Sequence, residues 1–464
     1  MNRLRILIVG SGPSAFGFIN GLNQNSDIEI TLIDNSKIEL VEEGCQFKKE
    51  FMTGNRKVEG LETKNPLISN HFGGFSNFWG GTYDDPKVEI IEYFSDLGID
   101  IKKYLGEIDN LIPRFIFSND PVKSEKTLLF DSILQPETIE KFRNLGFNVK
   151  DSEIATNDSR FMNFNKHKKC EYCGEIESFC REDSIWDTKK FVLNLIEKNE
   201  IKYLDNTKLI SFEENKDVVE CKLSIKNKTH LEKFDKLILA TGPVSTAEIL
   251  LISKIVNKVT IKTTDLIQVP FLKFFKTSEK LHSFCDLYSS VKVLDTYTYQ
   301  QHYFFSKTIL MLSKNAFKLS AILKVMPKFL LSLVGGMFIT LDSKVSSKII
   351  MSNSDNQIKT IYLDGERKKR NKILRSFFIK LLKLKIILFL PIKKVWLKGS
   401  SYHNGSQFPL DKTASSKTSD SLGRISNLKN THIVDSSVLP DVNTGPGVKL
   451  IIANSYRIGS NLYS

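Results

Sequence analysis

The chain has 464 residues, of which 41% are hydrophobic, and this length predicts two domains or one large domain that carries an inserted one. Lys and Arg number 66 against 53 Asp and Glu, a formal net charge of +13. This charge is compatible with an anionic partner, but scattered lysines are also typical of a solvated basic surface. The six cysteines in so long a chain exclude a secreted disulfide framework and favour a reducing, cytoplasmic setting.

Residues 5–22, RILIVGSGPSAFGFINGL, predict a buried β-strand, a glycine turn and an apolar helix, which is the order of a dinucleotide-binding crossover. We expect Gly10 to permit the tight turn and Gly12 to let the backbone approach a pyrophosphate. Ala15 is small enough for the helix to pack closely on the strand. The amides of the first helical turn, with that of Ser14 among them, and the positive end of the helix dipole favour a diphosphate.

The second strand, IEITLID at residues 28–34, ends at Asp34. An acidic residue about twenty residues after the glycine turn is placed to accept hydrogen bonds from ribose hydroxyls. Strand, glycines, helix, strand and acid together predict a dinucleotide site, and they leave open whether the ligand is NAD or FAD.

A glycine-rich segment follows, HFGGFSNFWGGTYDD at residues 71–85. So many glycines in a short span predict backbone that lies close to a flat ligand, with polar and aromatic side chains as edge contacts. The alternative is an ordinary surface loop. The candidate contacts are Gly74, Ser76, Asn77, Trp79 and Gly80.

A cysteine-rich segment, HKKCEYCGEIESFC at residues 167–180, raises the question of a metal site. Cys170 and Cys173 have chelating spacing, and His167 and Cys180 could complete four ligands. Because no second Cys-x-x-Cys pair exists to close a site, we expect free thiols and no bound metal.

The segment FDKLILATGPVSTAEILLIS, residues 234–253, repeats the order of strand, small-residue turn and helix, with Thr241 and Gly242 in the turn. Alternating residues between Ile201 and Lys236 predict a small antiparallel meander before it. A strand-turn-helix unit this late in the chain predicts a dinucleotide-binding domain that is discontinuous in sequence.

Residues 315–398 combine apolar residues with Lys and Arg. Neither apolar run in this region predicts a membrane-spanning helix, because lysines and prolines, Pro327 and Pro391 among them, interrupt both runs short of the roughly twenty residues that a bilayer requires. Such a composition suits a surface that dips into anionic lipid headgroups. The alternative is the core of a substrate domain with solvated lysines.

Near the C-terminus, SYHNGSQFPL at residues 401–410 places the isolated His403 among small residues. The later THIVDSSVLP predicts a strand that delivers Asp435 and Ser436 to a turn rich in glycine and proline. A helix is expected to begin after Gly447, and its N-terminal dipole would suit the pyrimidine end of a flavin, where negative charge builds on reduction.

Five motifs in this order resemble the glucose-methanol-choline (GMC) oxidoreductase family, in particular its bacterial branch found with sugar and polysaccharide enzymes. They span the chain from end to end, whereas residues 260–395, where a variable substrate domain would lie, match nothing in the family. The resemblance implies an α/β fold in which a Rossmann-type FAD-binding domain, discontinuous in sequence, accompanies a mixed α+β substrate domain. The motifs are VGSGPSA with Asp34, GGFSNFWGG, LATGPVSTAEILL, YHNGSQFPL and GRISNLKNTHIVDSSVLP.

The resemblance also implies FAD as cofactor and oxidation of the CH–OH group of a sugar or other alcohol, in polysaccharide biosynthesis or modification. His403 matches the family's catalytic histidine, and an imidazole with an unperturbed pKa near ~6.5 suits the base that takes the hydroxyl proton. The family's second catalytic slot falls at Pro446, so Asn443 is a stand-in, and a flavin-binding partner or scaffold protein without dehydrogenase activity is the alternative. An NAD-dependent dehydrogenase would leave the C-terminal motifs without a role.

The expected organisation divides the chain into five segments. The sequence does not identify the electron acceptor of the reaction. No nucleic-acid-binding module accompanies the positive charge, so we expect no nucleic-acid partner. We expect a cytoplasmic protein. Peripheral contact with the inner face of the membrane through residues 315–398 stays open, beside the favoured alternative of a substrate-domain core with solvated lysines. The segments are residues 1–84, the first part of the FAD-binding domain; 85–185, a connecting and cap region; 186–260, the second part with the meander; 261–395, the basic and apolar substrate domain; and 396–464, the C-terminal part with His403.

Overall fold

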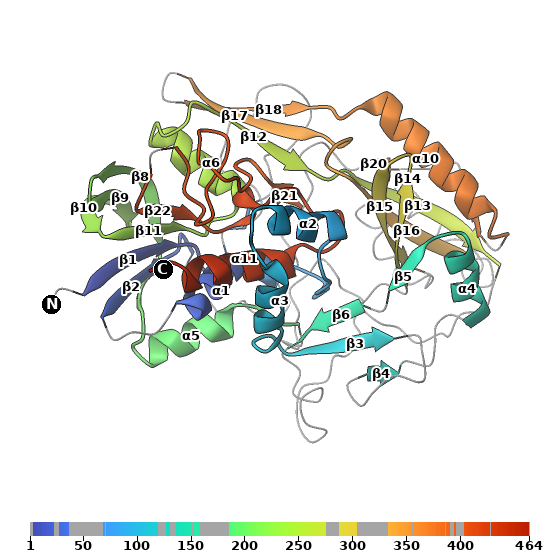
Figure 1. Cartoon of the computed structure of the whole chain (residues 1–464), viewed down its shortest axis with the longest axis horizontal. Coiled ribbons are helices and arrows are strands. Elements are labelled where there is room, and N and C mark those ends of the chain that lie inside the picture. Colours follow the sequence, from blue (N-terminus) through green and yellow to red (C-terminus); the bar gives the residue numbers. More distant parts are fainter. Residues whose placement is uncertain are drawn as a thin grey trace.

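Figure 1 shows the computed structural model of the chain, in which the N-terminal strands lie at one end and a large antiparallel sheet lies at the other. The cysteine-rich segment, with His167, Cys170, Cys173 and Cys180, lies outside the described residues, as do Pro327 and Pro391. The described residues are 3–22, 27–36, 68–69, 71–118, 127–129, 136–150, 152–156, 185–274, 287–303, 333–354, 357–385, 387–389, 394–395, 403–426 and 428–463.

A five-stranded parallel sheet in the order β22-β11-β1-β2-β7 forms the centre of the first domain. Its strands come from widely separated parts of the chain, as the repeated strand-turn-helix unit predicted. Ile6, Leu7 and Ile8 of β1 have no exposed surface, because both faces of a parallel sheet are covered. The strands are β1 (Leu4–Val9), β2 (Ile28–Ile33), β7 (Lys202–Leu204), β11 (Lys236–Leu239) and β22 (Thr431–Ile433).

Helices cover one face of this sheet, and the predicted meander with a further helix covers the other (Figure 1). Ile6 and Ile8 pack in the apolar cluster of the first layer, whereas Leu7 packs in the cluster of the second, as the alternation of side chains along a strand requires. The first layer contains α1 (Pro13–Gly21), α5 (Lys189–Glu197) and α11 (Val448–Ser460), and the second contains β8 (Thr207–Asn215), β9 (Val218–Ile225), β10 (Lys228–Phe234) and α6 (Pro243–Ile252).

Helices α1 and α11 cross in close contact. A Cβ atom added to Gly17 would lie 2.4 Å from the carbonyl oxygen of Ile452, and one added to Gly21 would lie 2.1 Å from that of Tyr456. Only glycine therefore fits at these two positions of α1. The close approach fixes the position of α11 relative to α1, and both helices begin at the same cavity.

Two antiparallel sheets form most of the second half of the structure. The four-stranded sheet, in the order β18-β17-β12-β21, packs through Ile349 and Met351 in the same apolar cluster as Leu250 of α6. The larger sheet has the order β19-β13-β16-β15-β14-β5, with β20 beside β13. The strands are β12 (Lys258–Thr263), β17 (Lys348–Ser354), β18 (Gln357–Leu363) and β21 (Asn404–Gly405), and then β5 (Asn148–Lys150), β13 (Leu266–Lys273), β14 (Leu287–Val293), β15 (Thr296–Tyr303), β16 (Val334–Leu341), β19 (Ile387–Phe389) and β20 (Lys394–Val395).

One face of the larger sheet is covered by α4 (Pro136–Asn144) and α10 (Arg367–Leu382). Ile267 and Phe271 of β13 pack on this face against Phe377 of α10. Because side chains alternate along a strand, Leu266 points to the opposite face, toward the parallel sheet.

The remaining described elements are two helices, three strands that form a small sheet, and two short 3₁₀ turns. Within the described residues, no helix combines the length and the hydropathy that crossing a bilayer requires. These elements are β3 (Arg114–Ser118), β4 (Thr127–Leu129), β6 (Ser152–Ala155), α2 (Val88–Asp96), α3 (Ile101–Asp109) and the short 3₁₀ turns η2 (Gly74–Asn77) and η4 (Ser436–Val438).

Candidate functional site

A cavity of about 380 Å³ lies between the carboxyl ends of the parallel strands and the large antiparallel sheet, the place where doubly wound sheets bind their ligands. All the residues predicted to form the site line this cavity except Ala15 and Asn77. Ala15 is instead fully buried between α1 and the parallel sheet, so its role is packing and not contact with a ligand. The predicted residues that line the cavity are Gly10, Gly12, Ser14, Asp34, Gly74, Ser76, Trp79, Gly80, Thr241, Gly242, His403, Asp435, Ser436 and Asn443.

Bare backbone forms part of the cavity wall. Gly10 has a φ of +98°, and a Cβ atom there would lie 2.6 Å from the carbonyl oxygen of Ala240. Gly12 has an ordinary φ of −79°, and a Cβ atom there would meet nothing closer than 3.9 Å. Gly10 therefore serves the turn itself, whereas the missing side chain of Gly12 leaves open space beside the backbone.

Three helix N-termini meet at the cavity. Gly12, Gly242 and Gly447 are the N-cap residues of α1, α6 and α11, and none of them caps its helix with a side chain. All three line the cavity. The first amides of a helix have no partner within the helix, and the helix dipole makes this end partially positive. Three such ends suit a ligand with several anionic groups.

Asp34 lies at the cavity, at the end of β2, but other protein groups already bind its carboxylate. Ser11 donates to Oδ2 through both its backbone N–H, at 3.0 Å, and its hydroxyl. Ser36 donates to Oδ1 in the same way, at 3.0 and 2.7 Å. A carboxylate has about four acceptor positions, so a ribose hydroxyl would bind Asp34 after one serine hydroxyl rotates away.

The glycine-rich segment is held by hydrogen bonds to the first turn. The Gly73 N–H donates to the Ser11 hydroxyl oxygen at 2.8 Å. The Thr188 hydroxyl lies between the two segments, 2.8 Å from the carbonyl oxygen of Ser11 and 3.2 Å from that of Gly73. The prediction that Asn77 contacts the ligand is wrong, because Asn77 does not line the cavity. Its amide nitrogen instead donates to the carbonyl oxygens of Phe72 and Gly74 within the loop. Its role is therefore to hold the loop in its shape.

Trp79 lines the cavity in an orientation set by one hydrogen bond. Its indole Nε1 donates to the carbonyl oxygen of Trp186 at 2.8 Å, and the two rings lie edge to face at 6.2 Å. The indole nitrogen is therefore engaged with the protein, and the ring offers its apolar surface to a ligand.

Asp435 joins two of the segments that form the cavity. Its carboxylate accepts hydrogen bonds from the Thr246 hydroxyl of α6, at 2.6 Å, and from the backbone N–H and hydroxyl of Ser437. Burial raises the pKa of Asp435, and these hydrogen bonds act in the opposite direction. The Thr241 hydroxyl bonds to that of Thr246 at 2.7 Å. The pair of acid and threonine ties β22 to the start of α6.

His403 reaches the cavity because strand pairing holds the residues around it. Asn404 and Gly405 form β21, which pairs with the end of β12, and the His403 carbonyl oxygen accepts the N–H of Thr264 at 3.2 Å. Burial lowers the pKa of the His403 imidazole from 6.5 to about 4, and a hydrogen bond to the backbone of Asn443 acts in the opposite direction. The imidazole is therefore neutral at neutral pH.

Asn443 lies next to His403, and its backbone forms a hydrogen bond with the imidazole. This hydrogen bond opposes the effect of burial on the pKa of His403. The neutral ring carries its proton on one nitrogen. The other ring nitrogen keeps its lone pair. The Asn443 side chain donates to the carbonyl oxygen of Pro446, which closes the turn that precedes α11.

Several cavity residues come from the region without a recognisable motif. Tyr288 and Tyr299 lie side by side with ring centroids 6.0 Å apart, and the Tyr288 hydroxyl bonds to that of Thr82 at 2.9 Å. No sequence signal marks them, since their strands alternate like any half-buried strand. The members of this group that line the cavity are Thr264, Leu266, Tyr288, Tyr299, Phe338 and Thr340.

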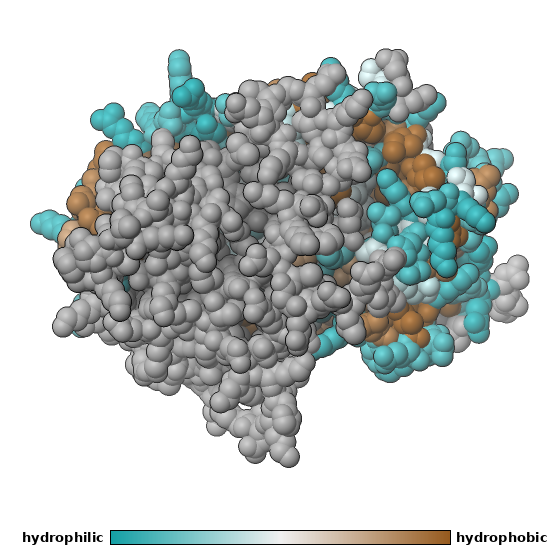
Figure 2. Space-filling view, turned by 180° about the vertical axis from the view of Figure 1, so that it is seen from behind, coloured by the Kyte–Doolittle hydropathy of each residue, from teal (hydrophilic) through white to brown (hydrophobic). Residues whose placement is uncertain are grey.

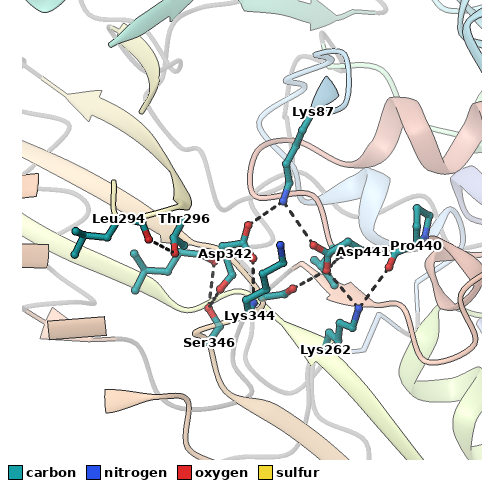
Figure 3. A network of polar contacts seen from close by, with 12 residues as sticks. Lys87, Lys262, Leu294, Thr296, Asp342, Lys344, Ser346, Pro440 and Asp441 are labelled. Carbon is teal, nitrogen blue, oxygen red and sulfur yellow. Dashed lines mark hydrogen bonds and ion pairs between the residues drawn. The ribbon is translucent and has the colours of Figure 1, made fainter. Parts of the chain in front are cut away.

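A network of charges holds Asp441, two residues before Asn443 in sequence, as Figure 3 shows. Lys87, before α2, points between two carboxylates and lies 3.1 Å from Asp342 Oδ2 and 3.7 Å from Asp441 Oδ2. Lys262 lies 3.6 Å from Asp441 Oδ1, and Ser343 donates to the same oxygen at 2.6 Å. The network therefore joins α2, β12 and the end of β16 to the turn before α11.

Replacing Lys87 by Met should lower the free energy of unfolding by about 3 kcal/mol, because Asp342 would stay buried without its cation. Urea denaturation of the two proteins measures this change. Lys262→Met is the matched control. Its side chain is 36% exposed, against 14% for Lys87, so its loss should cost less than about 1 kcal/mol. Equal losses for the two variants would contradict the special role of Lys87.

Comparisons with known proteins bear on the fold. Neither the protein-family models nor the curated proteins include a match to this chain. Among solved structures, the chain is similar to pyridoxine 4-oxidase from Mesorbium loti, with a TM-score of 0.69, coverage of 99% of both chains and 10% sequence identity. At this identity the similarity shows a shared fold. The predicted α/β fold, with a discontinuous Rossmann-type domain and a second domain, is confirmed.

Proposed function

We propose that the protein is an FAD-dependent oxidoreductase that oxidises the CH–OH group of a sugar or another alcohol, with His403 as the base. The observation that carries the proposal is one cavity in which three helix N-termini and glycine backbone meet the neutral imidazole of His403. The first features suit a dinucleotide, and the last suits proton removal. The similarity in fold to a protein named as an oxidase is consistent with this assignment.

The cavity residues fit FAD. The amides at the start of α1, beside Gly12 and Ser14, would hold the diphosphate, and Asp34 would hold the ribose once a serine hydroxyl has moved. The open space beside Gly12 and Gly242, where an added Cβ atom meets no close neighbour, is what close approach of a diphosphate requires. The N-terminus of α11 would stabilise negative charge on the isoalloxazine ring.

In the proposed reaction, His403 removes the hydroxyl proton of the substrate. The neutral imidazole has one ring nitrogen whose lone pair can take this proton. FAD, when bound, supplies the acceptor for the hydride that leaves the carbon, so the substrate loses two electrons and two hydrogens and becomes a carbonyl compound. The hydrogen bond to the Asn443 backbone orients the His403 ring in the cavity wall.

The cavity offers aromatic and hydroxyl groups to the substrate. Tyr288, Tyr299 and Phe338 present ring surfaces, and Thr264 and Thr340 lie among them. Aromatic faces beside hydroxyl groups suit a ring-shaped alcohol, which has apolar faces and a polar edge. A sugar fits this description, and so does a hydroxymethyl group on an aromatic ring.

One observation favours the alternative, a flavin-binding partner protein without dehydrogenase activity. The Asn443 amide nitrogen donates to the Pro446 carbonyl oxygen and is therefore engaged away from the substrate. If no second polar side chain assists His403, catalysis rests on the imidazole and the hydride acceptor.

The first experiment is the visible absorbance spectrum of the purified protein before and after acid precipitation. We expect flavin bands and release of FAD into the supernatant. Aldoses and pyridoxine are then added without oxygen, and bleaching of the oxidised band identifies a substrate. A colourless protein that does not take up added FAD would contradict the cofactor. FAD that no alcohol bleaches would favour the non-enzymatic alternative.

A further inference from the structure

Helix α10 presents two opposite faces. Its inner face packs in the core of the large sheet through Ile373, Leu374, Phe377 and Leu381. Its outer face carries residues at a spacing of four and three positions, which places them in one line along a helix. The residues in this line are Lys368, Lys372, Arg375, Ile379 and Leu382, and all are exposed.

The outer face is strongly cationic. The stretch 367–385, which contains α10 and the turn after it, has nine Lys and Arg residues and no Asp or Glu. Arg370 is turned inward and pairs with Asp265 at 2.7 Å. The two nearest acids in sequence, Asp364 and Glu366, both precede the helix. The face therefore attracts an anionic surface.

The C-terminal end of the same face is apolar and exposed. Ile379 is 51% exposed and Leu382 is 47% exposed. The turn after the helix adds the exposed Lys383 and Lys385 beside these two apolar side chains. Figure 2, which shows this end of the molecule at its left edge, has brown hydrophobic surface beside teal hydrophilic surface there.

We propose that this outer face of α10 docks on a membrane that contains anionic phospholipids. Cations beside the exposed aliphatic side chains of Ile379 and Leu382 match a lipid interface, which accepts both the charges and the apolar groups. A nucleic acid would bind the cations but would leave the apolar side chains in water. The face lies on the outside of the large sheet, opposite the cavity, so the bound protein keeps its site accessible.

The test is sedimentation of the whole protein with vesicles of phosphatidylcholine alone or mixed with phosphatidylglycerol. We expect binding to the mixed vesicles only, and binding that weakens as salt is added. The combined variant Lys368→Ser, Lys372→Ser and Arg375→Ser should bind the mixed vesicles about a hundredfold more weakly. The variant Ile379→Ser with Leu382→Ser should bind about tenfold more weakly.

The meander offers a matched control. Lys222, Lys226 and Lys228 are exposed on β9, β10 and the turn between them, and Leu231 on β10 is 66% exposed. Changing these four residues to Ser removes the same number of charges and an apolar side chain, and should leave binding unchanged. The circular dichroism spectrum of each variant checks that it folds.

Three outcomes would overturn the proposal. The first is a wild-type protein that does not bind the mixed vesicles. The second is an equal loss in the α10 and meander variants, which would assign binding to net charge. The third is binding of duplex DNA that depends on Lys368, Lys372 and Arg375 but not on Ile379 and Leu382, with no binding to vesicles. None of these measurements depends on the cofactor or on activity.

Discussion

Replacing His403 by Ala should lower the rate at which an alcohol substrate reduces the flavin by about 10²–10⁴-fold, the range that a positioned base contributes. The content of FAD should not change, because the diphosphate and ribose contacts lie on other segments. Stopped-flow absorbance under anaerobic conditions measures the rate, and the flavin spectrum measures the content. A His403→Ala protein that is reduced at the wild-type rate would remove this residue from the mechanism.

The pH dependence follows from the lowered pKa of His403. The neutral imidazole is the active form, and its pKa is about 4 because the ring is buried. The rate of flavin reduction should therefore be level around neutral pH and should fall as the pH is lowered through about 4. An exposed imidazole would lose activity through 6.5 instead, so the position of the fall reports whether the ring stays buried when the ligands bind.

His432 provides the control for both measurements. Burial lowers its pKa to about 4 as well, and its Nδ1 bonds to the Leu422 carbonyl oxygen at 3.0 Å. It does not line the cavity. His432→Asn removes a buried titrating ring and keeps a donor for Leu422. This variant should show the wild-type rate and the wild-type pH profile.

Gly10→Ala and Gly12→Ala should separate folding from cofactor binding, although the two glycines lie two residues apart. At Gly10 the positive φ and the overlap with the Ala240 carbonyl oxygen should reduce the free energy of unfolding by roughly 3 kcal/mol or more. At Gly12 neither obstacle exists, so the protein should keep its stability. Its methyl group would occupy the space proposed for the diphosphate.

The expected result for Gly12→Ala is a tenfold to hundredfold weaker affinity for FAD, which corresponds to about 1–3 kcal/mol of steric overlap. Urea denaturation of the FAD-free proteins measures stability, and fluorescence titration with FAD measures affinity. If Gly12→Ala bound FAD as tightly as the wild type, the diphosphate would not approach α1 at this point, and the proposed binding mode would be wrong.

The local units of the fold could be predicted from the sequence because short-range physics determines them. A glycine placed for a tight turn, a proline placed for the first helical turn and a run of apolar residues are all visible in RILIVGSGPSAFGFINGL. The same pattern around Thr241 and Gly242 identified the second unit. Parallel pairing of β1 with β2 and β11 then follows, because each strand-turn-helix unit must cover the sheet with its helix.

The role of individual side chains was harder to predict, because it depends on which neighbour lies within hydrogen-bonding distance. Asn77 carries a polar amide in a glycine-rich segment, as a ligand contact would, yet its amide nitrogen donates to two carbonyl groups of its own loop. Asp34 was correctly placed at the end of its strand, but its bonds to Ser11 and Ser36 could not be predicted, because they depend on how two turns pack together.

The sequence by itself determined the discontinuous Rossmann-type domain, because turns, caps and apolar runs act over a few residues. Most of the site residues that it predicted line one cavity. Only the tertiary structure decided what closes that cavity. Tyr288, Tyr299 and Phe338 come from strands whose alternation indicates a face but not the partner opposite it. The bond from Lys87 to Asp342, across 255 residues, depends on packing between sheets, which no local pattern encodes.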